Sequence, residues 1–243
     1  MIFLGPGAGN PVCQVVDVTS ANSCNNLSPY PLQINDASAG GVINGIPVIC
    51  GGRTSNGEES ACYGYSKSSQ SWDFSVNMVI SRKRPASALL NSGVLWVTGG
   101  YTSHNNEYYL KSTDYIFVNG EGNLERSNGP DLPEARIAHC MVTLHDGLIM
   151  ILGGSYLTGT SVRVTLTGDP DQGFSDESGP TLLFDRSNAA CVVFNSPLHG
   201  NRPVVIAAGG ASQVTAEILD YTVSGSSWEQ SKTHFKIIKH ISS

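Results

Sequence analysis

The stretch Val94-Leu95-Trp96-Val97-Thr98-Gly99-Gly100, a short apolar run that ends in two glycines, decides the fold because the chain repeats it. The same pattern recurs at 46–52, 148–154 and 204–210, and in a degenerate form at 1–7. From Gly52 onward, the second glycines of the doublets are 48, 54 and 56 residues apart. A repeat of about 50 residues has the length of one four-stranded structural unit.

The glycine doublets have a conformational reason. Glycine adopts positive φ without a Cβ clash, so the chain can leave a buried strand abruptly and reverse its direction. We therefore expect sharp structural turns at the four complete doublets, Gly51-Gly52, Gly99-Gly100, Gly153-Gly154 and Gly209-Gly210.

A pair of aromatic residues follows two of the doublets at the same spacing. Tyr65 precedes Trp72 by seven positions, and Tyr221 precedes Trp228 by seven, each across a turn rich in Ser or Gly. This spacing predicts two antiparallel strands with the aromatic side chains near opposite ends, where cross-strand pairs stabilise a hairpin.

Each unit also contains a connector with proline and then a run of small and apolar residues. An arginine leads most of these runs, namely Arg84, Arg136 and Arg186. Small side chains suit an innermost strand, where neighbouring units converge. Each unit thus reads as four strands: a small inner one, an apolar one ending in Gly-Gly, one with Tyr, and an outer one with Trp.

The doublets, the Tyr and Trp seven apart and the small-residue strand together resemble the kelch repeat, from Met1 to about Trp228. The resemblance implies an all-β fold, a kelch-type β-propeller of four-stranded blades, as a single domain over 1–243. About five blades are visible, and the first begins at its second strand. Two explanations compete for the remainder. Either 233–241 supplies the missing inner strand, or the chain is a fragment of a six- or seven-bladed ring; the tail 233–243 is bulky, basic and atypical, which favours the fragment.

Composition and charge exclude several classes of function. The 243 residues include 40% hydrophobic and 14% charged residues, with 27 glycines and a net charge of −6. A nucleic-acid binder needs a basic face, and 14 Lys plus Arg spread along the chain do not form one. No apolar run approaches the roughly 18 residues that a membrane span needs.

Six cysteines are compatible with three disulfides, but spacing alone does not choose among 15 pairings. The alternative is buried free thiols. Asn26-Leu27-Ser28 fits a glycosylation sequon. Together these features favour an extracellular over a cytoplasmic location.

No catalytic group, metal site or cofactor is predicted. His139 and Cys140 are adjacent on an expected strand and so face opposite ways, and the cysteine is either a packed thiol or disulfide-bonded to Cys191. The six histidines have no paired spacing for copper, and the acidic residues lie mostly in turns.

The function expected is therefore non-catalytic binding of a protein or peptide through loops on one propeller face. The kelch resemblance implies that arginines before the inner strands, Arg84, Arg136 and Arg186, help form a ligand face that suits an acidic peptide; the alternative is that each pairs with a nearby acid such as Glu134 or Asp185. The loops after the doublets add Arg53, Tyr101, His104 and Tyr156. A secreted carbohydrate-binding or carbohydrate-active propeller is the second hypothesis. The sequence does not determine the oligomeric state.

Overall fold

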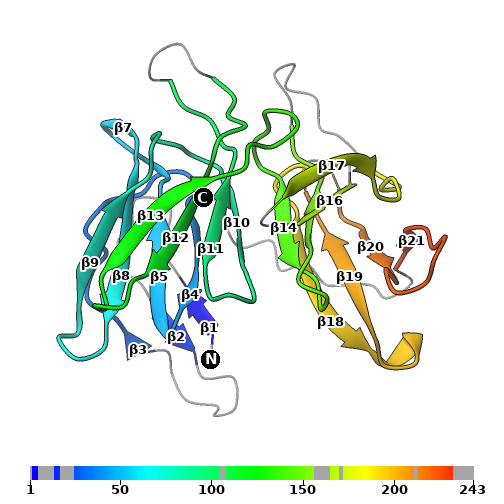
Figure 1. Cartoon of the computed structure of the whole chain (residues 1–243), viewed down its shortest axis with the longest axis horizontal. Coiled ribbons are helices and arrows are strands. Elements are labelled where there is room, and N and C mark those ends of the chain that lie inside the picture. Colours follow the sequence, from blue (N-terminus) through cyan, green and yellow to red (C-terminus); the bar gives the residue numbers. More distant parts are fainter. Residues whose placement is uncertain are drawn as a thin grey trace.

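The computed structural model describes residues 2–4, 14–16, 25–103, 108–155, 165–169, 172–210 and 213–231 (Figure 1). Within these ranges the chain consists of β-strands, loops and one short 3-10 helix, η2 (Pro197–His199). The degenerate glycines Gly5 and Gly7 and the tail 233–243 lie outside the described residues. The structure therefore does not choose between a closing strand at 233–241 and a fragment of a longer ring.

Five antiparallel sheets follow one another along the described chain, each with its strands in sequence order, and a two-stranded sheet of β6 and β7 is inserted between β5 and β8. Their strands are, in sheet 1, β1 (Ile2–Leu4), β2 (Gln14–Val16) and β3 (Asn25–Asn26); in sheet 2, β4 (Ala39–Ile43), β5 (Ile46–Cys50), β8 (Ala61–Ser66) and β9 (Ser71–Asn77); in sheet 3, β10 (Ala86–Leu89), β11 (Leu95–Thr98), β12 (Thr113–Val118) and β13 (Leu124–Gly129); in sheet 4, β14 (Cys140–Thr143), β15 (Ile149–Leu152), β16 (Thr165–Asp169) and β17 (Gly173–Ser178); and in sheet 5, β18 (Ala190–Ser196), β19 (Arg202–Ala208), β20 (Ala216–Leu219) and β21 (Glu229–Gln230). The predicted order of four strands per unit is confirmed in sheets 2 to 5. Sheet 1 begins at its apolar strand, as expected.

The glycine doublets lie where the second strand of each sheet ends. Both glycines of every doublet have positive φ, for example +59° at Gly99 and +101° at Gly100. At Gly99 a Cβ would lie only 2.5 Å from the carbonyl oxygen of Arg136, so a side chain is excluded by contact as well as by conformation. The predicted turns are confirmed.

Backbone hydrogen bonds join each sheet to the next at these doublets. The N–H of Gly52 donates to the carbonyl of Arg82, that of Gly100 to Arg136, and that of Gly154 to Arg186, at 2.7–2.9 Å. Closer to the inner strands, a second series runs from Arg84 N–H to the Ala37 carbonyl, from Ala138 to Arg84 and from Asn188 to Ala138, at 2.8–3.1 Å. The inner strands β4, β10, β14 and β18 consequently lie side by side in chain order.

Apolar clusters fill the spaces between neighbouring sheets. Ile43 and Val48 of sheet 2 pack with Leu95 and Val97 of sheet 3. Equivalent clusters join sheet 3 to sheet 4 and sheet 4 to sheet 5. A sheet buries both faces only when neighbours flank it, and the fold therefore depends on the repetition.

The two Tyr–Trp hairpins each attach their tryptophan to a connector. In sheet 2 the rings of Tyr65 and Trp72 meet edge to face with centroids 5.4 Å apart, as predicted. The Trp72 indole N–H donates to the Ser28 carbonyl at 3.0 Å, and Trp228 donates to the Pro180 carbonyl at 2.8 Å. Each tryptophan thereby fastens the outer edge of its sheet to the proline-bearing connector that leads into it.

Two disulfides cross-link the described residues. Cys50 and Cys62 are cross-strand partners on β5 and β8, with Cα atoms 4.0 Å apart. Cys140 and Cys191 join the inner strands of sheets 4 and 5, with Cα atoms 6.0 Å apart. This confirms the disulfide alternative for Cys140 and rejects buried free thiols for these four cysteines; Cys13 and Cys24 lie outside the described residues.

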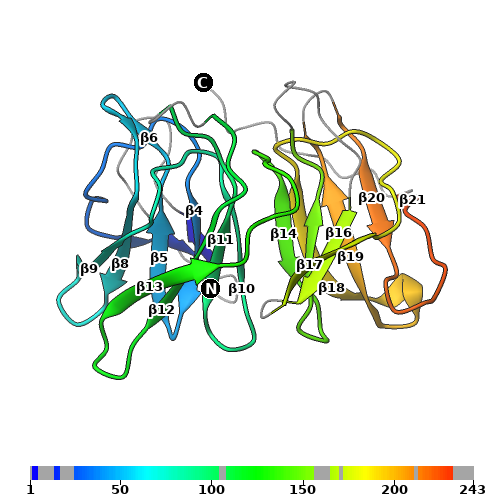
Figure 2. The same ribbon diagram turned by 45° about the horizontal axis from the view of Figure 1, so that its top comes forward.

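The strands of every sheet run between the same two ends of the molecule (Figure 2). We call the end that carries the glycine doublets and the connectors the doublet face, and the end that carries the turns β4–β5, β8–β9 and their equivalents the hairpin face. The small β6 (Arg53–Thr54) and β7 (Gly57–Glu58) hairpin projects on the doublet face.

Candidate functional site

Three arginines in the connectors are buried beneath the doublet face. Arg82, Arg136 and Arg186 each precede the first residue of an inner strand by four positions, and each accepts the hydrogen bond from the preceding doublet. The residue equivalent to Arg136 and Arg186 is thus Arg82, and the prediction that placed Arg84 in this series is wrong by two positions. The side chains are at most 1% exposed.

The buried arginines bind the protein itself. Arg82 Nη1 donates to the carbonyls of Gly99 and Ser112, both at 2.8 Å, and its Nη2 pairs with Asp114 at 2.8 Å. Arg186 Nε lies 2.6 Å from Glu217 on β20, and this acid, not Asp185, is its partner. Arg136 and Arg186 are too deeply buried to contact a ligand directly, which corrects the expectation that they form the binding face.

In contrast to these buried arginines, a set of exposed residues lies on the doublet face between sheets 2 and 3. Arg53 and Asp36 form a backbone bridge, and Arg84 Nε donates to both carboxylate oxygens of Asp36 at 3.1 Å. The side chains of Arg53 and Arg84 remain 51% and 40% exposed. Both arginines were predicted to bind. Asp36 contacts the backbone of Arg53 and the side chain of Arg84, while Arg53 Nε lies 3.9 Å from Glu58.

Tyr101 extends this surface on the side of sheet 3. Its backbone bridges Lys83, and the Lys83 ammonium lies 4.8 Å from the centre of the Tyr101 ring. Lys83 Nζ also lies 3.8 Å from Glu58, a buried carboxylate on β7. Burial alone would raise the pKa of Glu58, but hydrogen bonds from Ser103 Oγ and N–H and the charge of Lys83 lower it overall below 4.5. Glu58 therefore stays ionised and holds the loop of sheet 3 against sheet 2.

Two further tyrosines complete the surface. The rings of Tyr108 and Tyr109 lie 6.1 Å and 5.8 Å from Tyr101, and Tyr108 is 50% exposed. We define the doublet-face patch as Arg53, Lys83, Arg84, Tyr101, Tyr108 and Tyr109. Lys83, Tyr108 and Tyr109 were not predicted; the run Tyr108-Tyr109 close behind a doublet was the signal for the last two.

Two predicted binding residues, His104 and Tyr156, lie outside the described residues. Of the seven residues predicted to bind, three therefore belong to the patch, two are buried, and two are not placed. Ser155, the first residue after the next doublet, is buried where its backbone bridges Ile137.

His139 is a titratable group buried between sheets 3 and 4. Its Nε2 lies 2.7 Å from Thr98 Oγ1. Burial, and secondly the charge of Arg136, hold the pKa of His139 well below its usual 6.5. The neighbouring Cys140 is in a disulfide and so has no free thiolate. Neither residue offers a nucleophile or an exposed base.

The described ranges show no sign of a metal site or of a helix that spans a membrane. No three His, Cys, Asp or Glu side chains of those ranges converge as metal ligands would. Nor do the ranges contain a helix with the length and apolarity of a membrane span.

The solved structures supply a comparison for the whole arrangement. The chain matches the structure of YjhT, a kelch-repeat propeller, over 86% of its own length and 69% of the YjhT chain, with a TM-score of 0.69. The chain has the fold of a kelch-type β-propeller. Sheets 2 to 5 are accordingly four of its blades, with the strands β4, β10, β14 and β18 nearest the propeller axis.

The likeness does not extend to function. The two sequences are 13% identical, so the match establishes the fold, and a propeller supports many unrelated activities. No protein-family model matches the chain, and no curated protein matches it in sequence. Function must therefore be argued from the surface of this propeller.

Proposed function

We propose that this propeller is a non-catalytic interaction module that binds a protein or peptide partner through the doublet-face patch. The observation that carries the proposal is the pair Arg53 and Arg84, whose side chains are half-exposed beside a cluster of tyrosines. Arg84 pairs with Asp36, and Arg53 Nε lies 3.9 Å from Glu58. Arginine and tyrosine are the residue types most enriched where binding energy concentrates in protein interfaces.

The charge distribution favours an acidic partner. The carboxylate of Glu58 is buried, and that of Asp36 is covered by Arg84, whereas both guanidinium groups reach solvent. A guanidinium group binds a carboxylate with two parallel hydrogen bonds, and the tyrosine rings offer rigid apolar area beside it. A peptide with acidic residues next to an apolar or aromatic one fits this surface.

Backbone hydrogen bonds hold the segments that carry the patch. The backbone of Tyr101 pairs with Lys83, and Arg84 N–H donates to the Ala37 carbonyl in the neighbouring blade. A preorganised surface loses less conformational entropy on binding. The two disulfides fit the extracellular location that we propose, because disulfides persist in oxidising compartments.

Selection from a displayed peptide library against the immobilised protein tests the proposal. We expect enrichment of acidic peptides, and a loss of affinity of about tenfold or more in the variants Arg53→Glu and Arg84→Glu. Lys67→Glu is the matched control, since Lys67 is an exposed cation in the β8–β9 turn on the hairpin face. Peptides that bind all three variants equally well, or no enrichment at all, would contradict the proposal.

A further inference from the structure

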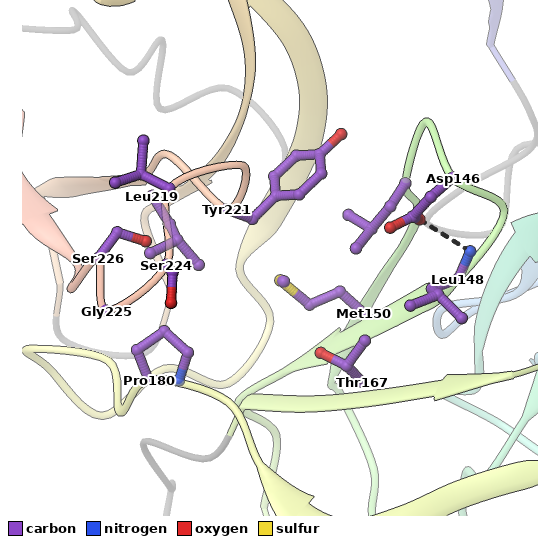
Figure 3. A pocket seen from close by; sticks show the side chains of 12 residues that line it. Asp146, Leu148, Met150, Thr167, Pro180, Leu219, Tyr221, Ser224, Gly225 and Ser226 are labelled. Carbon is purple, nitrogen blue, oxygen red and sulfur yellow. Dashed lines mark hydrogen bonds between the residues drawn. The ribbon is translucent and has the colours of Figure 1, made fainter.

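A cavity of about 290 Å³ lies on the hairpin face between sheets 4 and 5, away from the doublet-face patch. One wall comes from the β14–β15 turn and from β15 and β16, and the other from the end of β20 and the turn that follows it (Figure 3). The lining residues are Leu144, Asp146, Leu148, Met150, Thr167, Pro180, Leu219, Tyr221, Val223, Ser224, Gly225 and Ser226.

The two Tyr–Trp hairpins use their tyrosines differently, and the second tyrosine lines the cavity. In sheet 2, Tyr65 is buried and its ring packs on Trp72. In sheet 5 the equivalent Tyr221 is only half-buried, and its hydroxyl is bound instead by His145 of sheet 4, at 3.2 Å from the backbone N and 2.9 Å from Nδ1. Tyr221 therefore stands as a wall between the blades, and the space beside it is open.

The lining combines an apolar floor with an edge rich in hydrogen-bond acceptors. Met150 and Leu219 are buried at the base, and Tyr221 adds an aromatic ring. Asp146, Thr167 and Ser224 contribute a carboxylate and two hydroxyl groups. Asp146 is the one charged residue among those that line the cavity, so an anionic ligand is disfavoured and a ligand with several hydroxyl donors is favoured.

The volume limits the ligand further. Small-molecule sites generally begin at about 300 Å³, so this one admits a single ring. A pyranose has this size, an apolar C–H face that packs on an aromatic ring, and hydroxyl groups around its edge. We propose that the cavity binds one uncharged monosaccharide unit, with the ring against Tyr221 and Met150 and its hydroxyl groups toward Asp146, Thr167 and Ser224.

The proposal is independent of peptide binding, because none of these residues belongs to the doublet-face patch. Met150 gives a direct readout. It is one of four methionines in the chain, and Met78 and Met141 are buried in other clusters. In protein labelled with ¹³C at the methionine methyl groups, addition of methyl glucoside, methyl galactoside, methyl mannoside or methyl N-acetylglucosaminide should shift the Met150 signal saturably.

The Met78 and Met141 signals should stay in place, and methyl glucuronide, the anionic counterpart, should bind at least about tenfold more weakly. Ser224→Phe places a ring in the mouth of the cavity and should abolish the shift. Ser68→Phe makes the same change at the equivalent turn position of the Tyr65–Trp72 hairpin and should leave the shift unchanged.

Three results would each overturn the proposal: a Met150 signal that does not move for any neutral glycoside up to about 50 mM, well above millimolar affinity; equal binding of the glucuronide; or a Ser224→Phe protein that still responds.

Discussion

The backbone N–H of Gly100 donates a 2.9 Å hydrogen bond to the carbonyl of Arg136, a residue 36 positions later that leads into the next sheet. The preceding glycine, Gly99, has a φ of +59° and no room for a Cβ atom against the same carbonyl. The doublet therefore both ends the second strand of one blade and attaches that blade to the next.

Substitution of Gly99 should show how much this contact contributes. In Gly99→Ala the new methyl group meets the Arg136 carbonyl in addition to the cost of positive φ, so we expect a loss of about 3 kcal/mol in the free energy of unfolding. Gly122→Ala is the control, because Gly122 also has positive φ, +87°, but nothing lies within 4 Å of its Cβ position; its loss should be about 1 kcal/mol. Urea unfolding of both proteins measures the difference. Equal losses would mean that the carbonyl contact is unimportant.

The pair Arg186 and Glu217 should behave as a buried ion pair. Arg186→Met leaves the Glu217 carboxylate buried without its guanidinium partner, and we expect a loss of about 3–5 kcal/mol. The double variant Arg186→Met/Glu217→Gln removes the stranded charge and keeps one acceptor oxygen for the backbone N–H of Leu183 or Phe184. Because the stranded charge is gone, it should recover at least about 1 kcal/mol in a double-mutant cycle, although one of these two N–H groups then loses its acceptor. A purely additive cycle would contradict the assignment.

Acid should destabilise the propeller through His139. The pKa of His139 lies well below 6.5 in the folded protein because the ring is buried and near Arg136, whereas an unfolded chain restores the ordinary value. Between these two pKa values the unfolded state binds more protons, so the free energy of unfolding falls as the pH drops below about 6.5, by up to about 1.4 kcal/mol per pH unit.

His139→Gln should reduce this slope when unfolding is measured at several pH values between about 7 and 5. His199→Gln is the matched histidine variant, because His199 is partly exposed and contacts Ser196 on the hairpin face. Identical slopes in the wild type and His139→Gln would show that another group is responsible.

The two disulfides should contribute unequally. The Cys140–Cys191 bond closes a loop of 51 residues and the Cys50–Cys62 bond one of 12. On chain-entropy grounds their removal should cost about 4 and about 3 kcal/mol respectively. Unfolding of the Cys140→Ala/Cys191→Ala and Cys50→Ala/Cys62→Ala proteins compares them. A larger loss for the shorter loop would show that packing, rather than loop entropy, dominates.

Much of the fold was predictable because each repeat places the same residue types at equivalent positions. The positive φ at Gly51 and Gly209 and the ring contact of Tyr65 with Trp72 follow from residue type and spacing. The four-strand order follows from the alternation of small, apolar and aromatic segments. These features depend on contacts within one repeat or with its immediate neighbour, so a single sequence contains them.

The candidate site was predicted less well, because it depends on which of two nearby residues faces inward. In Arg82-Lys83-Arg84 the sequence offers two arginines, and only the register of the following strand makes Arg82 the buried one. Glu217 was not recognised as the partner of Arg186, since it lies 31 positions away on the third strand of the sheet. The cavity beside Tyr221 depends on a hydrogen bond from another blade, which no pattern within the hairpin indicates.

The hydrogen bonds that run from Asn188 to Ala138, from Ala138 to Arg84 and from Arg84 to Ala37 have a consequence for how the molecule opens. Each of these amides is protected by a carbonyl of the adjacent blade, so it exchanges its hydrogen with solvent only when two blades separate. Amide exchange near the propeller axis would thus measure the separation of neighbouring blades, whereas amide exchange in the outer strands would measure fraying within one blade.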